Sequence, residues 1–153
     1  MLLAEALAER AQAQERLNSL HERLLTVARV QEGDTPEEDP QELLRELDGV
    51  AGRIDELVQA INATNIATAF DEKRNLMEAL ALRDGLLRKR RIYHDLAQRA
   101  GTRSDRYSRN EIKFVSTIPV ADMRKRVDDL SKQYRELDTR IQQLNWNTEL
   151  KNG

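Results

Sequence analysis

The chain has 153 residues and a formal net charge of −2, and this length fits a single domain over residues 1–153. Alanine, glutamate, lysine, leucine and arginine supply 77 of the residues, a share typical of long helices and coiled coils. Aromatic residues make up only 4% and there are three prolines, which argues against a β-sandwich or barrel. Cysteine is absent, which excludes disulfides, cysteine–metal sites and thiol chemistry.

The order of polar and apolar residues argues against a membrane or secreted protein. No apolar run approaches the ~18 residues that a membrane-spanning helix needs. Glu5 and Glu9 stand too early for the apolar core of a signal peptide. The sequence therefore predicts a soluble, cytoplasmic protein without a membrane partner.

The first predicted helix covers about residues 2–30. Its apolar residues recur at alternating steps of three and four, and only Arg10 interrupts the series. A 3.5-residue period kept over this length indicates coiled-coil packing. The seam consists of Leu3, Ala6, Ala13, Leu17, Leu20, Leu24 and Val27.

An acidic turn follows and leads into a second predicted helix over about residues 40–69. Asp39 precedes Pro40, and we expect the Asp39 side chain to cap this helix, because proline loses no hydrogen bond at the first helical position. The second seam becomes polar at its end, at Thr64 and Thr68. Its apolar members are Leu43, Leu47, Val50, Ile54, Leu57 and Ile61.

The third predicted helix covers about residues 72–100, with Asp71 as its cap and Gly101 just after its end. Extending the phase of the second helix would place polar residues on the seam, so we predict a tight turn between the two helices. The best apolar stripe of the third helix consists of Ala79, Leu82, Leu86, Tyr93, Leu96 and Ala100.

Residues 101–119 form the longest irregular segment, an arm whose apolar residues alternate near its end. A fourth helix is predicted over about residues 120–148. Its seam is apolar at all eight positions: Val120, Met123, Val127, Leu130, Tyr134, Leu137, Ile141 and Leu144.

Together these elements predict an all-α fold, an elongated antiparallel bundle of four long helices with coiled-coil packing. Helices of this length are roughly 40–45 Å long at 1.5 Å per residue. Narrow seams bury little surface within one chain, so we expect a homo-oligomer that completes its core with further chains.

Polar residues gather at one end of this predicted bundle and form a candidate ligand-binding site. With simple up-and-down connections, the end of the second helix, the start of the third and the end of the fourth meet there. A hydrogen-bonded polar layer that fixes the helix register is the interpretation we favour over a ligand site. The candidate ligand-binding residues are Asn62, Asn65, Thr68, Arg83, Asp84 and Trp146.

Charge is divided between two segments. Residues 31–56 hold ten acidic and two basic side chains, whereas residues 83–113 hold ten basic and four acidic ones. We favour mutual neutralisation, within the chain or between subunits. Nucleic acid remains an alternative partner, because arginine suits bidentate phosphate contact. The candidate nucleic-acid-binding residues are Arg88, Lys89, Arg90, Arg91, Arg103, Arg106 and Arg109.

Catalytic patterns are missing from the sequence. There is no Glu-x-x-His pair of the kind that di-iron bundles use, and no glycine-rich phosphate loop or hydrolase motif. His21 and His94 are isolated and lie off the seams. We therefore expect no enzyme activity, no metal and no cofactor.

Four segments of the sequence, taken in their order along the chain, suggest a family resemblance. They are VQEGDTPEEDP at 30–40, INATNIAT at 61–68, RYSRNEIKF at 106–114 and LSKQYRELDTRIQQLNWNTEL at 130–150. With them the chain resembles a small bacterial family of uncharacterised helical proteins called septicolysin-like. The family name implies a pore-forming, membrane-acting protein, and the resemblance implies no active-site residue.

Besides a binder of small ligands or anions at the polar end of the bundle, which would use Asn62, Asn65, Arg83 and Trp146, three functions are open from the sequence. The first is a non-enzymatic, oligomeric coiled-coil scaffold or adaptor, which the four seams favour. The second is a nucleic-acid-associated protein that uses the basic segment at 83–113. The third is the membrane-acting protein that the resemblance implies.

Overall fold

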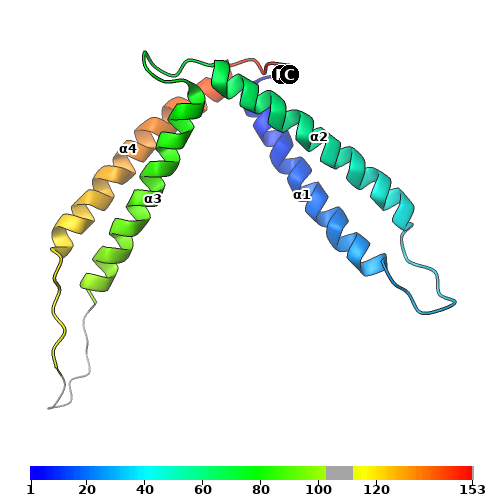
Figure 1. Cartoon of the computed structure of the whole chain (residues 1–153), viewed down its shortest axis with the longest axis horizontal. Helices are drawn as coiled ribbons and strands as arrows, with labels where there is room; N and C mark the ends of the chain where they lie inside the picture. Colours follow the sequence, from blue (N-terminus) through cyan, green and yellow to red (C-terminus); the bar gives the residue numbers. More distant parts are fainter. Residues whose placement is uncertain (103–111, 153) are drawn as a thin grey trace. The chain divides into compact units, whose positions relative to one another are not determined.

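The computed structural model describes residues 1–102 and 112–152, and in these residues the protein is all-helical. The helices are α1 (Leu3–Val27), α2 (Pro40–Ala67), α3 (Leu76–Ala100) and α4 (Val120–Asn147) (Figure 1). The predicted all-α fold with four long helices is confirmed for this part of the chain.

The chain divides into two compact units. The first unit contains Met1–Leu76 and Gln142–Gly153, and the second contains Met77–Ile141. α1 and α2 form an antiparallel hairpin in the first unit, and most of α4 lies antiparallel to α3 in the second (Figure 1). The single domain over residues 1–153 stays a prediction.

The α1–α2 hairpin packs along the two predicted seams. Every seam residue of both helices is buried or half-buried, and Arg10 is half-buried as well. Near the turn that joins the helices, Leu20, Val27 and Leu43 form a buried cluster against which Leu24, Leu47 and Val50 pack.

The two chain termini meet in the first unit. The Leu3 amide donates a hydrogen bond to the Thr148 carbonyl at 2.8 Å, and the Leu150 amide donates to the Met1 carbonyl at 2.8 Å. The Lys151 amide donates to Thr64 Oγ1 at 2.9 Å. These bonds hold the segment after α4 against the start of α1 and against α2.

The start of α2 has the predicted cap. Asp39 Oδ1 accepts a hydrogen bond from the Gln41 amide at 2.9 Å, and Pro40 occupies the first helical position. The preceding turn passes through Gly33, whose φ of 90° lies in the left-handed region that suits glycine. The predicted cap at Asp39 is therefore confirmed.

The predicted break between the second and third helices is confirmed, but the predicted start of the third is wrong. α3 begins at Leu76, not at residue 72. Asp71 closes the turn instead of capping the helix, because its Oδ1 accepts from the amides of Lys73 and Arg74 at 2.8 Å each. An isolated bridge between Ala69 and Asn75 completes the turn.

The predicted stripe of α3 is wrong in two positions. Leu82 and Leu96 are 39% and 36% exposed, whereas Ala97 is buried. The helical phase of the buried Ala79 and Ala97 passes instead through Arg83, which is half-buried, and through Arg90, which is exposed and bonded to Ser131. Arginine can follow such a phase because its apolar stem lies along the seam while its charged end reaches a polar partner.

α4 presents its predicted seam inward, since all eight seam residues are buried or half-buried. The end of α3 lies close to the start of α4 at Gly101. A Cβ on Gly101 would stand 3.0 Å from the Ala97 carbonyl oxygen and 3.5 Å from Val120 Cγ1. Gly101 therefore suits the close approach of the two helices rather than a left-handed cap.

Truncation of Leu57, which is 1% exposed, should lower the free energy of unfolding by about 2–5 kcal/mol, because Leu57→Ala leaves a cavity in the seam. Leu44 is on the same helix and 41% exposed, so Leu44→Ala should change the free energy of unfolding by about 0.5 kcal/mol or less. Urea denaturation followed by circular dichroism measures both. Equal losses in the two variants would contradict the assigned phase of α2.

Candidate functional site: two oppositely charged surfaces

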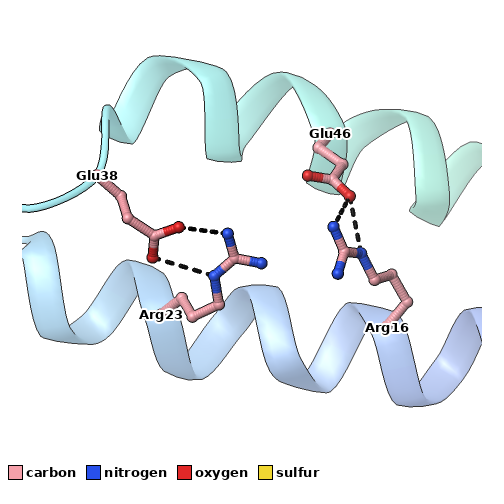
Figure 2. Close-up of polar contacts among 4 residues, drawn as sticks. All are labelled: Arg16, Arg23, Glu38 and Glu46. Carbon is pink, nitrogen blue, oxygen red and sulfur yellow. Dashed lines mark hydrogen bonds and ion pairs between the residues drawn. The ribbon is translucent and has the colours of Figure 1, made fainter.

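A ladder of ion pairs borders the seam between α1 and α2. Arg16 on α1 pairs with Glu46 on α2, and Arg23 on α1 pairs with Glu38 in the turn just before α2 (Figure 2). Arg53 reaches back from α2 to α1 and donates to both carboxylate oxygens of Glu9, at 2.6 and 3.0 Å.

The ladder repeats with the period of the seam. Glu9, Arg16 and Arg23 are spaced by seven residues on α1. Their partners Arg53 and Glu46 on α2 and Glu38 just before it are spaced by seven and eight. Sliding one helix by a heptad would place Glu9 beside Glu46, two like charges. The pairs therefore favour one register, as charges beside a coiled-coil seam do.

The arginines shift the acidity of their partners. The hydrogen bond from Arg53 lowers the pKa of Glu9, and the hydrogen bond from Arg23 lowers the pKa of Glu38. Reciprocally, the bond to Glu38 raises the pKa of Arg23. All of these side chains are partly exposed, so each pair contributes little to stability by itself.

The two units carry opposite net charge. Over its full sequence the first unit holds 17 carboxylates against nine lysines and arginines, a formal charge of −8. The second holds 16 lysines and arginines against ten carboxylates, a formal charge of +6. The near-neutral total of −2 therefore conceals a strong separation of charge along the chain.

Polar contacts join α3 and α4 within the second unit. Arg83 Nη1 donates to Asp138 Oδ1 at 2.8 Å, and Arg90 Nε donates to Ser131 Oγ at 2.6 Å. Arg126 donates to the Tyr93 hydroxyl at 2.9 Å, with its guanidinium carbon 5.2 Å from the ring centre. These contacts assign a packing role to Arg83 and Arg90.

The predicted nucleic-acid-binding residues divide into three groups. Arg88, Lys89 and Arg91 are exposed on α3. Arg90 is exposed and bonded to Ser131. The remaining candidates, Arg103, Arg106 and Arg109, lie outside the described residues.

The predicted ligand-binding residues belong to both units. Asn62, Asn65, Thr68 and Trp146 are in the first unit, whereas Arg83 and Asp84 are in the second. Asn62 is exposed, Asn65 is half-buried, and Trp146 is 60% exposed. Arg83 is engaged by Asp138, and Asp84 is exposed. A common site for the six residues stays a prediction.

Thr64 and Asn145 are buried in the first unit, and Thr68 is half-buried there. Thr64 is fully buried, donates from Oγ1 to the Ala60 carbonyl at 2.7 Å and accepts from the Lys151 amide. Thr68 donates to the Thr64 carbonyl at 2.7 Å. Asn145 is 6% exposed. Both hydroxyls donate to carbonyls one turn back along the chain, and the bond from Lys151 to Thr64 joins the segment after α4 to α2.

Each unit also has a small hollow that sequence reasoning did not identify. One of 340 Å³ lies at the turn after α1, where Val27 and Val30 are bordered by Asp34 and Glu37. The other, of 440 Å³, lies beside the end of α3 and is lined by Leu96, Ala100 and the segment 114–118. The signal that could have located them is the pairing of exposed valine or phenylalanine with one sign of charge.

Neither a metal cluster nor a membrane-spanning helix is found in the part of the chain that the structure describes. No group of three or more histidine, aspartate or glutamate side chains is arranged to hold a metal ion in residues 1–102 and 112–152. Within the same ranges, no helix combines the length and the apolar character that crossing a membrane requires.

The comparisons with known proteins place the chain in a family. The model of a family described as "Family of unknown function (DUF6847)" matches residues 10–150, so the chain belongs to this family. It is also similar to a crystal structure of a functionally unknown conserved protein from Corynebacterium diphtheriae. The two share 52% identity over 99% of each chain, with a TM-score of 0.92. No curated protein matches the chain.

The predicted resemblance to a septicolysin-like family is wrong. The matching family is one of unknown function, and nothing in the comparisons points to septicolysin-like proteins. The segments that suggested it contain no catalytic motif. The pore-forming function that the resemblance implied is withdrawn with it.

The ion pairs give the first unit a defined response to acid. A carboxyl whose pKa is lowered on folding stabilises the fold above its ordinary value of 4.5, and this contribution is lost as the pH falls through the lowered pKa. Arg53→Met should therefore make the free energy of unfolding fall less steeply between about pH 5 and pH 3. Arg45→Met is the control, because Arg45 donates to the Gln41 carbonyl of its own helix. Unfolding in urea at several pH values measures the slopes, and equal slopes in Arg53→Met and wild type would refute this role for Arg53.

Proposed function

We propose that the chain is a non-enzymatic scaffold that assembles with further copies of itself through its oppositely charged units. The observation that carries this proposal is the separation of charge, −8 in the first unit and +6 in the second. The negative unit of one copy attracts the positive unit of another, and like units repel. Such complementarity favours a defined arrangement of partners and speeds their encounter.

The helix seams support assembly through coiled-coil packing. The 3.5-residue spacing of α1, α2 and α4 is the spacing that packs helices side by side over long distances. α3 keeps large apolar side chains at its surface, with Met77 48% and Ile92 55% exposed. A further helix from another copy would remove these side chains from water.

The shifted carboxyls support a structural rather than a catalytic role. A general acid or base works best with a pKa near the working pH. The pKa values of Glu9 and Glu38 move the opposite way, downward, because arginine hydrogen bonds favour their ionised forms. Their chemistry suits permanent ion pairs between helices.

The absolute mass from light scattering after gel filtration tests the scaffold. At low salt we expect a mass above the 17.7 kDa of one chain, and at high salt a decrease, because salt screens exposed charges. The triple variant Arg88→Gln, Lys89→Gln and Arg91→Gln should dissociate at lower salt than wild type. Arg29→Gln removes a cation from the negative unit and should not weaken assembly. A wild-type monomer at every salt and concentration would rule the scaffold out.

Nucleic acid is a second candidate partner, favoured by the exposed cations Arg88, Lys89 and Arg91 on α3 of the positive unit. Affinity for a phosphate backbone depends steeply on salt, because each neutralised phosphate releases counterions. The negative unit opposes this function by repelling the same backbone.

A mobility-shift assay with single- and double-stranded DNA and RNA tests the second candidate. Binding should decrease steeply between about 50 and 200 mM salt, and the triple glutamine variant should weaken it for every sequence. A negative result for all four nucleic acids at low salt would eliminate this function.

A further inference from the structure

The segment that precedes α4 exposes the most prominent apolar side chains of the second unit. Ile112, Phe114 and Val115 are 87%, 92% and 80% exposed. Phe114 borders the hollow beside Leu96 and Ala100, yet this hollow leaves nearly all of its ring in water. Exposed apolar groups of this size mark an interaction surface. Residues 112–115 are called the apolar arm below.

The apolar arm and the hollow beside it carry positive charge. Lys113 lies within the arm and is exposed, and Arg99 lines the same hollow. The matching surface must therefore combine an apolar recess with carboxylates. A purely apolar recess would offer these cations no carboxylate to pair with.

The hollow at the turn after α1 has both properties. Val27 and Val30 supply its apolar side, and Asp34 and Glu37 supply carboxylates at its border. Glu32 is exposed in the same turn. The hollow has a volume of 340 Å³, which is enough room for one aromatic side chain. Its shape is fixed by Gly33 and by the hydrogen bond from the Asp34 amide to the Gln31 carbonyl at 2.9 Å.

We propose that the apolar arm of one copy docks into the hollow at the 26–37 turn of a second copy, with Phe114 in the recess and Lys113 beside Glu37. The inference rests on the proposed self-assembly and specifies its contact. Each copy carries the arm on its second unit and the hollow on its first, and in the proposed dimer the two copies exchange them. In such an isologous interface, residue i contacts residue j and residue j contacts residue i.

Charge complementarity selects a second copy over pairing between two arms. Arm against arm would bring Lys113 and Arg99 of both copies together, and two 26–37 turns would bring carboxylates together. Only arm against turn combines opposite charges with apolar contact on both sides. An acidic segment of another protein could meet the same requirement, and the test below separates that occupant from a second copy.

The experiment measures the self-association constant of full-length variants by analytical ultracentrifugation at low salt. Phe114→Ser should weaken association at least tenfold, whereas Ile66→Ser, at an apolar position of the first unit that is 57% exposed, should weaken it less than threefold. Lys113→Glu and Glu37→Lys should each weaken it. An equimolar mixture of these two charge variants should regain the wild-type association. In the mixed pair, the glutamate introduced at position 113 meets the lysine introduced at position 37, while the other contact keeps its native charges.

Three results would overturn the docking. Wild-type association that is unchanged by Phe114→Ser and by both charge variants would place the contact elsewhere and leave the scaffold standing. Weak association of both charge variants without recovery in the mixture would show that residues 113 and 37 do not meet. A wild type that stays monomeric at all concentrations would remove the scaffold together with the docking, and the arm would then serve a different partner.

Discussion

A single apolar stripe on each helix is the constraint on which this structure depends. Within a hairpin each helix has one neighbour, so only residues at the 3.5-residue spacing are removed from water. The rest of the helix surface faces solvent and is charged, which explains why 34% of the residues are ionisable. The pairs of Arg16, Arg23 and Arg53 lie at the border between the two regions. Each pair contributes little to stability by itself. Their sequence of charges nevertheless makes a shifted helix register unfavourable, because a shift would bring like charges together.

The same constraint explains which parts of the fold the sequence could predict. Three seams are uninterrupted or nearly so, and their spacing alone identified the inward faces of α1, α2 and α4. On α3 the inward phase contains Arg83 and Arg90, so a count of apolar residues selected Leu82 and Leu96 instead. The arginines are acceptable there because α4 offers Asp138 and Ser131. Whether an arginine is tolerated at such a position depends on its partner on another helix, and the local sequence pattern does not show that partner.

The start of α3 could not be predicted for a related reason. Aspartate is a favourable helix cap, but its carboxylate accepts hydrogen bonds from whichever backbone amides lie close to it. Here those amides belong to Lys73 and Arg74, and the hydrogen bonds from their backbone lower the pKa of Asp71. The turn covers residues 68–75 instead of residues 70 and 71, so α3 begins four residues later than expected, at Leu76.

For the candidate site, the sequence predicted only the net charge of its acidic and basic segments. Counting charges along the chain located the acidic and basic segments, because such a count needs no geometry. Which of those charges are engaged depends on contacts over long sequence separations, such as Arg53 with Glu9. The pairs at the ladder account for Glu38 and Glu46, whereas Glu37 remains exposed at the hollow. The structure thus separates charges that hold the hairpin from charges that face outward.

Ionic strength affects these two groups of charges differently. Ion pairs between Arg53 and its partners join atoms 2.6–3.1 Å apart, well within the screening length of about 8 Å at physiological salt. Attraction between the net charges of two units in different copies acts over longer distances, so salt weakens it more. The short pairs also persist because the apolar seams beside them bring the helices together whatever the salt concentration. Folding of a hairpin and assembly of copies therefore respond differently to ionic strength. If the mass of the assembly decreases with salt while the circular dichroism of the helices stays constant, the change reflects assembly alone.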